Sequence, residues 1–239
     1  MKSFKGDGFT IIETMLFLGI SGLLIMGVLV GTGVSINIQR YRDSVVSLQS
    51  VLQQQFNSVS NPINTRNNSW SCSSGGPVES GGQFIGQSDC VILGKLIRSS
   101  DGKKLTINDV IGYSNDGTAV NDIDILKQYK PKVFDSSVET YDIDWGSTLN
   151  PVKSNNPMNF SIFIVKSPLS GAVRTFINDN KSIFDSEIES IINESNLEKD
   201  LKICLNSNGF FNGNKMAVTI NANASSASSV ETLGDNSGC

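Results

Sequence analysis

Residues 9–60 read FTIIETMLFLGISGLLIMGVLVGTGVSINIQRYRDSVVSLQSVLQQQFNSVS, and this stretch decides the fold. Its residues 14–39 include no ionisable side chain. As a helix with about 1.5 Å of rise per residue, that segment would span roughly 39 Å, which is enough to cross a membrane. Residues 34–61 contain no glycine or proline, so we expect the same helix to continue into the polar sequence that follows.

The second half of this predicted helix has an apolar stripe. Its large apolar residues recur at spacings of three and four, which places them on one face of a helix. They are Tyr41, Val45, Leu48, Leu52, Phe56 and Val59. Charged and amide side chains such as Arg42, Gln49 and Gln53 fall largely on other faces. Pro62 disfavours a helical backbone in the residue before it, so the helix should end near residues 57–61.

Composition excludes several classes of function. The 239 residues are 38% hydrophobic, enough for a core, and include no histidine. Serine and cysteine nucleophiles activated by histidine, and metal sites built on histidine, are therefore excluded. The net charge of −4 gives no overall cationic field for nucleic acid. We expect no enzyme activity, no catalytic residue, no cofactor and no nucleic-acid partner.

The N-terminus is open to more than one interpretation. A cleaved secretory signal has an apolar core of about 7 to 15 residues and a small-residue cleavage site, and this run is longer and lacks such a site. An ordinary signal anchor fits the length, but the lysine and arginine residues at its two ends are equal in number and do not set its orientation. Glu13 lies inside the apolar segment, where an ionised group costs about 2.5 to 3.5 kcal/mol and therefore indicates function.

Residues 5–13, KGDGFTIIE, resemble the prepilin motif of the type IV pilin family: a basic leader, a glycine, an aromatic first mature residue and a glutamate fifth after the cut. The resemblance implies that a prepilin peptidase cleaves between Gly8 and Phe9 and that Phe9 is then N-methylated. It also implies that Glu13 acts in assembly with other pilin subunits on a pilus assembly platform. Three shorter and less specific segments are similar to pilins of Saccharibacteria: YRDSVVSL, Ser88-Asp89-Cys90 and SPLSG.

The motif has a physical explanation. Cleavage would create a cationic amine at Phe9, and Glu13 would lie one helical turn later on the same face. Either its own amine or that of a neighbouring subunit would neutralise the carboxylate, which would select one register of subunit addition. The alternative is that Glu13 only favours the helix N-terminus through the helix dipole. No helix-breaking proline stands near Val30, as it does in many major pilins, so melting of the helix in a filament stays open.

The chain after Pro62 has short, strand-like apolar runs. We predict hairpins from residues 90–98 with 105–107, from 160–166 with 172–177, and from 203–211 with 216–221. Further strands are expected at 110–113, 120–126 and 138–145. In the last of these, Tyr141, Ile143 and Trp145 should lie on one side. A short helix is expected at 183–200. The polar stretch 225–239 has too few apolar groups to dock by itself.

Four cysteines, Cys72, Cys90, Cys204 and Cys239, lie in the part of the chain expected outside the membrane. Without a CxxC motif, a zinc ribbon or thioredoxin-like site is disfavoured, and three pairings are possible. We favour Cys72 with Cys90 and Cys204 with Cys239, because local pairing suits hairpin neighbours; the second pair would enclose a loop like the disulfide-bounded loop of pilins. Oxygen-rich residues 115–124 have the wrong spacing for a calcium loop and are typical of turns.

These features predict an α+β protein with a leader (1–8), a transmembrane and assembly helix (9–36), an amphipathic helix (37–60) and a globular β-rich head (61–239). The resemblance implies a structural subunit of a type IV pilus, used in adhesion, twitching motility or attachment to host cells. Such a subunit would be a single-pass protein of the cytoplasmic membrane before assembly and extracellular afterwards. The alternatives are a pseudopilin or minor pilin of a type II secretion or DNA-uptake system and, from another class, a signal-anchored enzyme.

Overall fold

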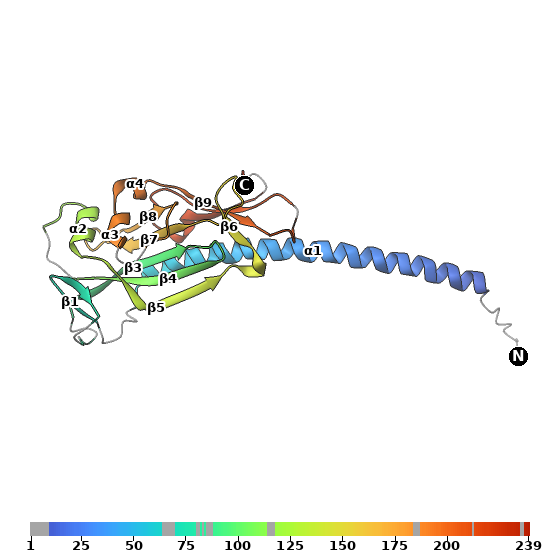
Figure 1. Ribbon diagram of the computed structural model, residues 1–239, viewed down its shortest axis with the longest axis horizontal. Helices are drawn as coiled ribbons and strands as arrows, with labels where there is room; N and C mark the ends of the chain where they lie inside the picture. The colour runs from blue at the N-terminus through green and yellow to red at the C-terminus, as the bar shows by residue number, and fades with distance from the viewer. Residues whose placement is uncertain are drawn as a thin grey trace, which may run out of the picture. The chain divides into compact units, whose positions relative to one another are not determined.

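The computed structural model describes residues 10–63, 70–79, 82, 84, 88–113, 118–183, 187–211, 213–234 and 237–239. The chain divides into two compact units, residues 1–40 and residues 41–239. One helix, α1 (Ile11–Ser60), contributes to both units (Figure 1). It ends within the range expected from Pro62, because proline cannot follow a helical residue without strain.

The head, residues 41–239, consists of the second half of α1 and several short elements. The strands are β1 (Ser71–Ser73), β2 (Gly76–Val78), β3 (Cys90–Ser99), β4 (Lys104–Tyr113), β5 (Lys132–Asp142), β6 (Thr148–Asn150), β7 (Phe160–Lys166), β8 (Val173–Asn178), β9 (Leu201–Asn206), β10 (Ala217–Ile220) and β11 (Val230–Leu233). The short helices are α2 (Asp122–Gln128), α3 (Ile188–Ile191) and α4 (Glu194–Leu197), with single turns of 3₁₀ helix at Asp144–Gly146 and Ala227–Ser229.

The strands form one five-stranded sheet, in the order β5-β4-β3-β7-β8, and one four-stranded sheet, in the order β11-β10-β9-β6. Strands β1 and β2 pair only with each other and form a third, two-stranded sheet. Every strand pair is antiparallel. A long helix followed by antiparallel sheets is an α+β fold, as the sequence predicts.

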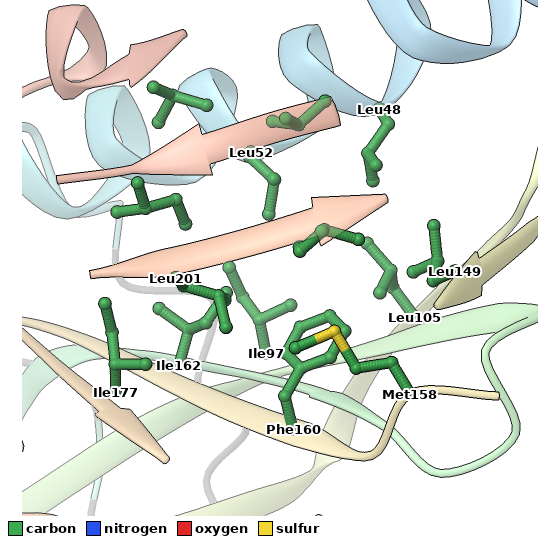
Figure 2. Close-up of a cluster of buried hydrophobic side chains, with 14 of the residues drawn as sticks. Leu48, Leu52, Ile97, Leu105, Leu149, Met158, Phe160, Ile162, Ile177 and Leu201 are labelled. Carbon is green, nitrogen blue, oxygen red and sulfur yellow. The ribbon is translucent and has the colours of Figure 1, made fainter. Parts of the chain in front are cut away.

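The apolar stripe of α1 is the centre of the main core. All six of its predicted members are buried, with at most 3% of each side chain exposed. They pack with residues of both sheets, and Figure 2 shows Leu48 and Leu52 of α1 facing this cluster, with Leu201 of β9 and Ile162 of β7. The helix therefore holds the two sheets together through one shared core.

A second core lies on the other face of the five-stranded sheet. In β7 the side chains alternate, so that Ile162 and Ile164 join the core of α1 while Phe163 and Val165 join the second core. The second core also takes Ile125 and Leu126 of α2, and Ile188 and Ile191 of α3. Because both faces of β7 are covered, its FSIFIVK run is nearly continuous in apolar residues.

One expected strand is wrong, and another is shorter at its C-terminal end than expected. The stretch 120–126 forms the start of helix α2, where the Asn121 side chain caps the helix by accepting a hydrogen bond of 2.8 Å from Asp124 N. The expected strand 138–145 ends at Asp142, because Trp145 takes a left-handed backbone with φ of 57°. As a result Ile143 is buried and Trp145 is 53% exposed, so the two do not share one side of a strand.

Three further elements differ from expectation. Residues 105–107 and 110–113 belong to a single strand, β4, with an irregularity in its pairing to β5 between Ile107 and Asp109. The helix expected at 183–200 is two short helices, because Asn193 starts a new one by accepting a hydrogen bond from Asn196 N. The polar C-terminal stretch does dock: β11 pairs with β10, and Val230 is buried.

Candidate functional site

The first half of α1 is an apolar surface without cover in the monomer. Its large apolar side chains between Ile11 and Ile36 are each between 46% and 77% exposed. The helix is long and apolar enough to cross a membrane, by its length and composition. Burial of apolar side chains is the main driving force of folding, so a surface of this kind requires lipid or another protein around it.

Glu13 is the only acidic residue in the described part of this segment, and it caps its own helix. Its Oε2 accepts hydrogen bonds from Thr10 N at 3.0 Å and from Thr10 Oγ1 at 3.1 Å. In return, Glu13 N donates to Thr10 Oγ1 at 3.3 Å. This reciprocal pair is a capping box, and the sequence signal for it is a threonine followed three residues later by glutamate.

The capping box gives Thr10 a role that was not predicted from the sequence. A capping box satisfies backbone N–H groups that have no partner within the helix. The carboxylate of Glu13 is exposed, and its contacts within the described residues are those with Thr10. Gly8 and Phe9, the predicted cleavage and methylation residues, lie outside the described residues.

The second half of α1 is fastened to the head by polar contacts as well as by its stripe. The Tyr41 hydroxyl donates a hydrogen bond to the carbonyl oxygen of Leu205 in β9 and accepts one from Met216 N, just before β10. Gln49 Nε2 and Gln53 Nε2 both donate to the carbonyl oxygen of Val230, at 3.0 and 3.1 Å. These two glutamines are thus contacts to the C-terminal strand rather than solvated side chains.

The C-terminal end of α1 is held by a lysine from the five-stranded sheet. Lys166 Nζ, at the end of β7, donates to the carbonyl oxygen of Ser60 at 3.1 Å. The last carbonyl groups of a helix lack partners within the helix and form the negative end of its dipole, so a cation there is favourable. The last turn of α1 has no basic residue of its own.

Two disulfides close the head. Cys72 is bonded to Cys90 and Cys204 to Cys239, with Cα atoms 5.2 and 5.7 Å apart. These are the two pairs favoured from the sequence. The first joins the β1–β2 hairpin to the start of β3, and the second ties residue 239 to β9 beside β10. In the loop-entropy model each bridge contributes about 3 to 4 kcal/mol.

The described part of the oxygen-rich stretch 115–124, which runs into the start of α2, has a structural role. Asp122 Oδ1 accepts a hydrogen bond of 2.5 Å from Ser167 Oγ. Its Oδ2 accepts hydrogen bonds of 3.0 Å from Ser170 Oγ and from Arg174 Nε. Burial acts to raise the pKa of Asp122, but the hydrogen bonds and the charge of Arg174 hold it below its usual value. No group of three or more metal-ligating side chains occurs among the described residues. Residues 115–117, part of the weak calcium candidate, lie outside them.

The structure therefore separates the predicted site residues into two groups. Glu13 lies on the exposed N-terminal part of α1, whereas the four cysteines brace the head. Comparison of the chain with protein-family models, curated proteins and solved structures finds no match.

Proposed function

We propose that this protein is a structural subunit of a type IV pilus filament, acting in adhesion, twitching motility or attachment to host cells. The observation that supports this best is the continuous helix α1, whose first half is exposed and apolar while its second half is built into the core of a disulfide-braced head. Before assembly the apolar half would cross the cytoplasmic membrane. After assembly it would be covered by the same segment of other pilin subunits.

Processing follows from the KGDGFTIIE segment. Prepilin peptidase would cut between Gly8 and Phe9, Phe9 would be N-methylated, and the assembly platform would receive the mature chain. The new amine would then meet the Glu13 carboxylate of a neighbouring subunit, replacing an unpaired charge by a pair in an apolar surrounding. Disulfides persist in oxidising compartments, which agrees with a head outside the cell.

The decisive experiment is mass spectrometry of the N-terminus of the protein purified from its native membrane. We expect a chain that starts at Phe9 with a methylated amine. The variant Gly8→Val should stay uncleaved, because glycine lets the peptidase approach the backbone next to the scissile bond. A Gly6→Val variant, two residues earlier, serves as the matched control and should be cut. An uncleaved wild-type chain starting at Met1 would remove the proposal.

A pseudopilin or minor pilin of a type II secretion or DNA-uptake system is the second candidate. The same N-terminal segment favours it, and the ICLNSNGFF stretch that contains most of β9 resembles the closing strand of such proteins. Immunogold electron microscopy separates the two. A structural pilin should label long filaments along their whole length, whereas a pseudopilin or minor pilin should label short filaments or isolated points.

A further inference from the structure

Two lysines are held in fixed positions beside the β1–β2 hairpin. Lys130 Nζ donates to the carbonyl oxygen of Ser74 at 2.5 Å, and Lys132 Nζ lies 5.6 Å from the centre of the Trp70 ring. Both side chains are exposed, and neither forms an ion pair within the described part of the chain. With the neighbouring Pro77 and Val78 they line a hollow of about 520 Å³, and we call these four residues the lysine surface.

The backbone contributes to this arrangement. Lys130 takes a left-handed conformation with φ of 47°, which is uncommon for a residue with a side chain. Gly76 of the hairpin also has a positive φ, of 101°, and a Cβ built on it would lie 3.3 Å from Cβ of Lys130. The hairpin and Lys130 are thus closely packed, and the ammonium group loses little further freedom when it meets an anion.

A second hollow, of about 510 Å³, lies at the other end of α2 and has the opposite charge. Its rim includes Val120, which is 92% exposed, and Leu169 in the β7–β8 turn, which is 51% exposed. Glu194 and Glu198 of the α4 region also line it, and neither forms an ion pair within the described residues. We call these four residues the acidic surface.

Other charges near the two surfaces change this contrast only in part. Arg174 lines the second hollow, but its guanidinium is paired with Asp122 at 2.9 Å. Glu189 lines the first hollow, so that hollow has two ammonium groups and one carboxylate. The lysine surface therefore keeps an excess of positive charge, and the acidic surface an excess of negative charge.

We infer that the lysine surface of one head binds the acidic surface of a second copy of this chain. The two surfaces are complementary. The acidic surface has exposed apolar side chains flanked by carboxylates, and the lysine surface has an apolar hollow flanked by fixed ammonium groups. Complementary charge sets the partner and the register of an interface, and like charges placed opposite each other are costly.

Because the two surfaces are different patches of the same molecule, the contact is heterologous. A heterologous contact whose rotation does not close generates an open helical filament. This inference rests on the proposed function and deepens it, since it adds a contact between heads to the assembly by α1. It also explains why exposed Val120 and Leu169 occur together beside Glu194 and Glu198, two carboxylates without an ion pair in the described part of the chain.

Charge reversal in the full-length protein, expressed in its own cells, tests the contact. We expect Lys130→Glu with Lys132→Glu to reduce filament number at least about tenfold, and Glu194→Lys with Glu198→Lys to do the same. The four changes combined should restore filaments, because the complementarity returns with its sign inverted. Lys103→Glu with Lys153→Glu, two exposed lysines outside both surfaces, is the matched control and should keep normal numbers. Normal filament numbers in either double reversal, or no rescue in the fourfold variant, would overturn the contact while leaving the proposed function intact.

A photo-crosslinking residue at Val120 gives a second readout that does not depend on counting filaments. We expect a covalent dimer whose attachment point maps to residues 75–78 or 130–132 of a second copy. Attachment to lipid, to another protein or to a different part of the head would overturn the inference. Absence of filaments from wild-type cells would instead contradict the proposed function, so the two failures are distinguishable.

Discussion

The Tyr41 hydroxyl donates a hydrogen bond of 2.8 Å to the carbonyl oxygen of Leu205, which lies 164 positions further along the chain. The Tyr41 hydroxyl oxygen in turn accepts a hydrogen bond of 2.7 Å from Met216 N, and the Tyr41 ring stacks on Phe211 with centroids 4.6 Å apart. Burial raises the pKa of Tyr41, an effect that the hydrogen bond from Met216 partly offsets. The first residue of the buried stripe therefore joins α1 to the four-stranded sheet.

Tyr41→Phe should keep the ring but leave the carbonyl of Leu205 and the N–H of Met216 without this partner. Unsatisfied buried polar groups cost about 1 to 3 kcal/mol, so the variant should unfold at a lower temperature by a corresponding amount. Thermal unfolding of the detergent-solubilised protein measures this. Tyr113→Phe is the control, because the Tyr113 hydroxyl makes no hydrogen bond within the described residues. An equal loss in both variants would contradict the role assigned to Tyr41.

The two roles of Glu13 can be separated by substitution. Glu13→Gln keeps the capacity to cap, since glutamine serves in capping boxes, but removes the charge. Thr10→Ala removes the cap at a cost of about 1 kcal/mol and keeps the carboxylate. We expect Glu13→Gln and Glu13→Ala to be cleaved normally but to form few filaments. Thr10→Ala should form many more filaments than either of these variants. Electron microscopy and immunoblots of sheared filaments provide the measurement. Normal filaments in Glu13→Gln would show that capping alone explains the residue.

The second disulfide should control only the last residues of the chain. Because β11 pairs with β10 and Val230 is held by Gln49 and Gln53, Cys239→Ser should expose residues beyond Leu233 to protease and leave β11 protected. Gln49→Ala with Gln53→Ala should instead loosen β11 while the disulfide stays closed. Limited proteolysis followed by peptide mapping under non-reducing conditions distinguishes the two patterns. Cleavage before Val230 in Cys239→Ser would contradict the independent docking of β11.

The head should also lose stability at high pH through Tyr141. The Tyr141 hydroxyl lies 2.9 Å from Ser47 Oγ and 3.0 Å from Asp144 Oδ2. Burial raises the pKa of Tyr141 from 10.0 to about 12. The hydrogen bond with Ser47 opposes this shift, and the nearby carboxylate of Asp144 adds to it. A raised pKa means that the folded state favours the protonated phenol. The contribution is thus fully present below pH 10.0 and is lost as the pH rises towards 12.

Denaturant unfolding across that range, with Tyr141→Phe as the test variant, measures this effect. The wild type should lose more stability than Tyr141→Phe between pH 10.0 and 12, whereas Tyr113→Phe should follow the wild type. The effect should be small, because the group is only partly buried and solvent screens it. Parallel curves for wild type and Tyr141→Phe would contradict the assignment.

The sequence alone determined the long helix, its buried stripe and the main hairpins, because each has a regular spacing of apolar residues. The stripe from Tyr41 to Val59 repeats with the helical period, and one face of a helix is buried as a unit. The runs at β3, β7 and β8 are apolar and β-branched, so a strand is the form that packs them. The capping box at Thr10 and Glu13 was not predicted, although the spacing of three between threonine and glutamate is its known sequence signal.

Only the tertiary structure decided the parts whose stability comes from distant partners. Strand β11 has one fully buried apolar residue, Val230, and its docking depends on backbone pairing with β10 and on two glutamines of α1. Helix α2 forms where a strand was expected, since Asn121 caps it and Ile125 finds the second core. Contacts of this kind leave no period in the sequence, because the residues that stabilise each other are far apart along the chain and meet only after the sheets have formed.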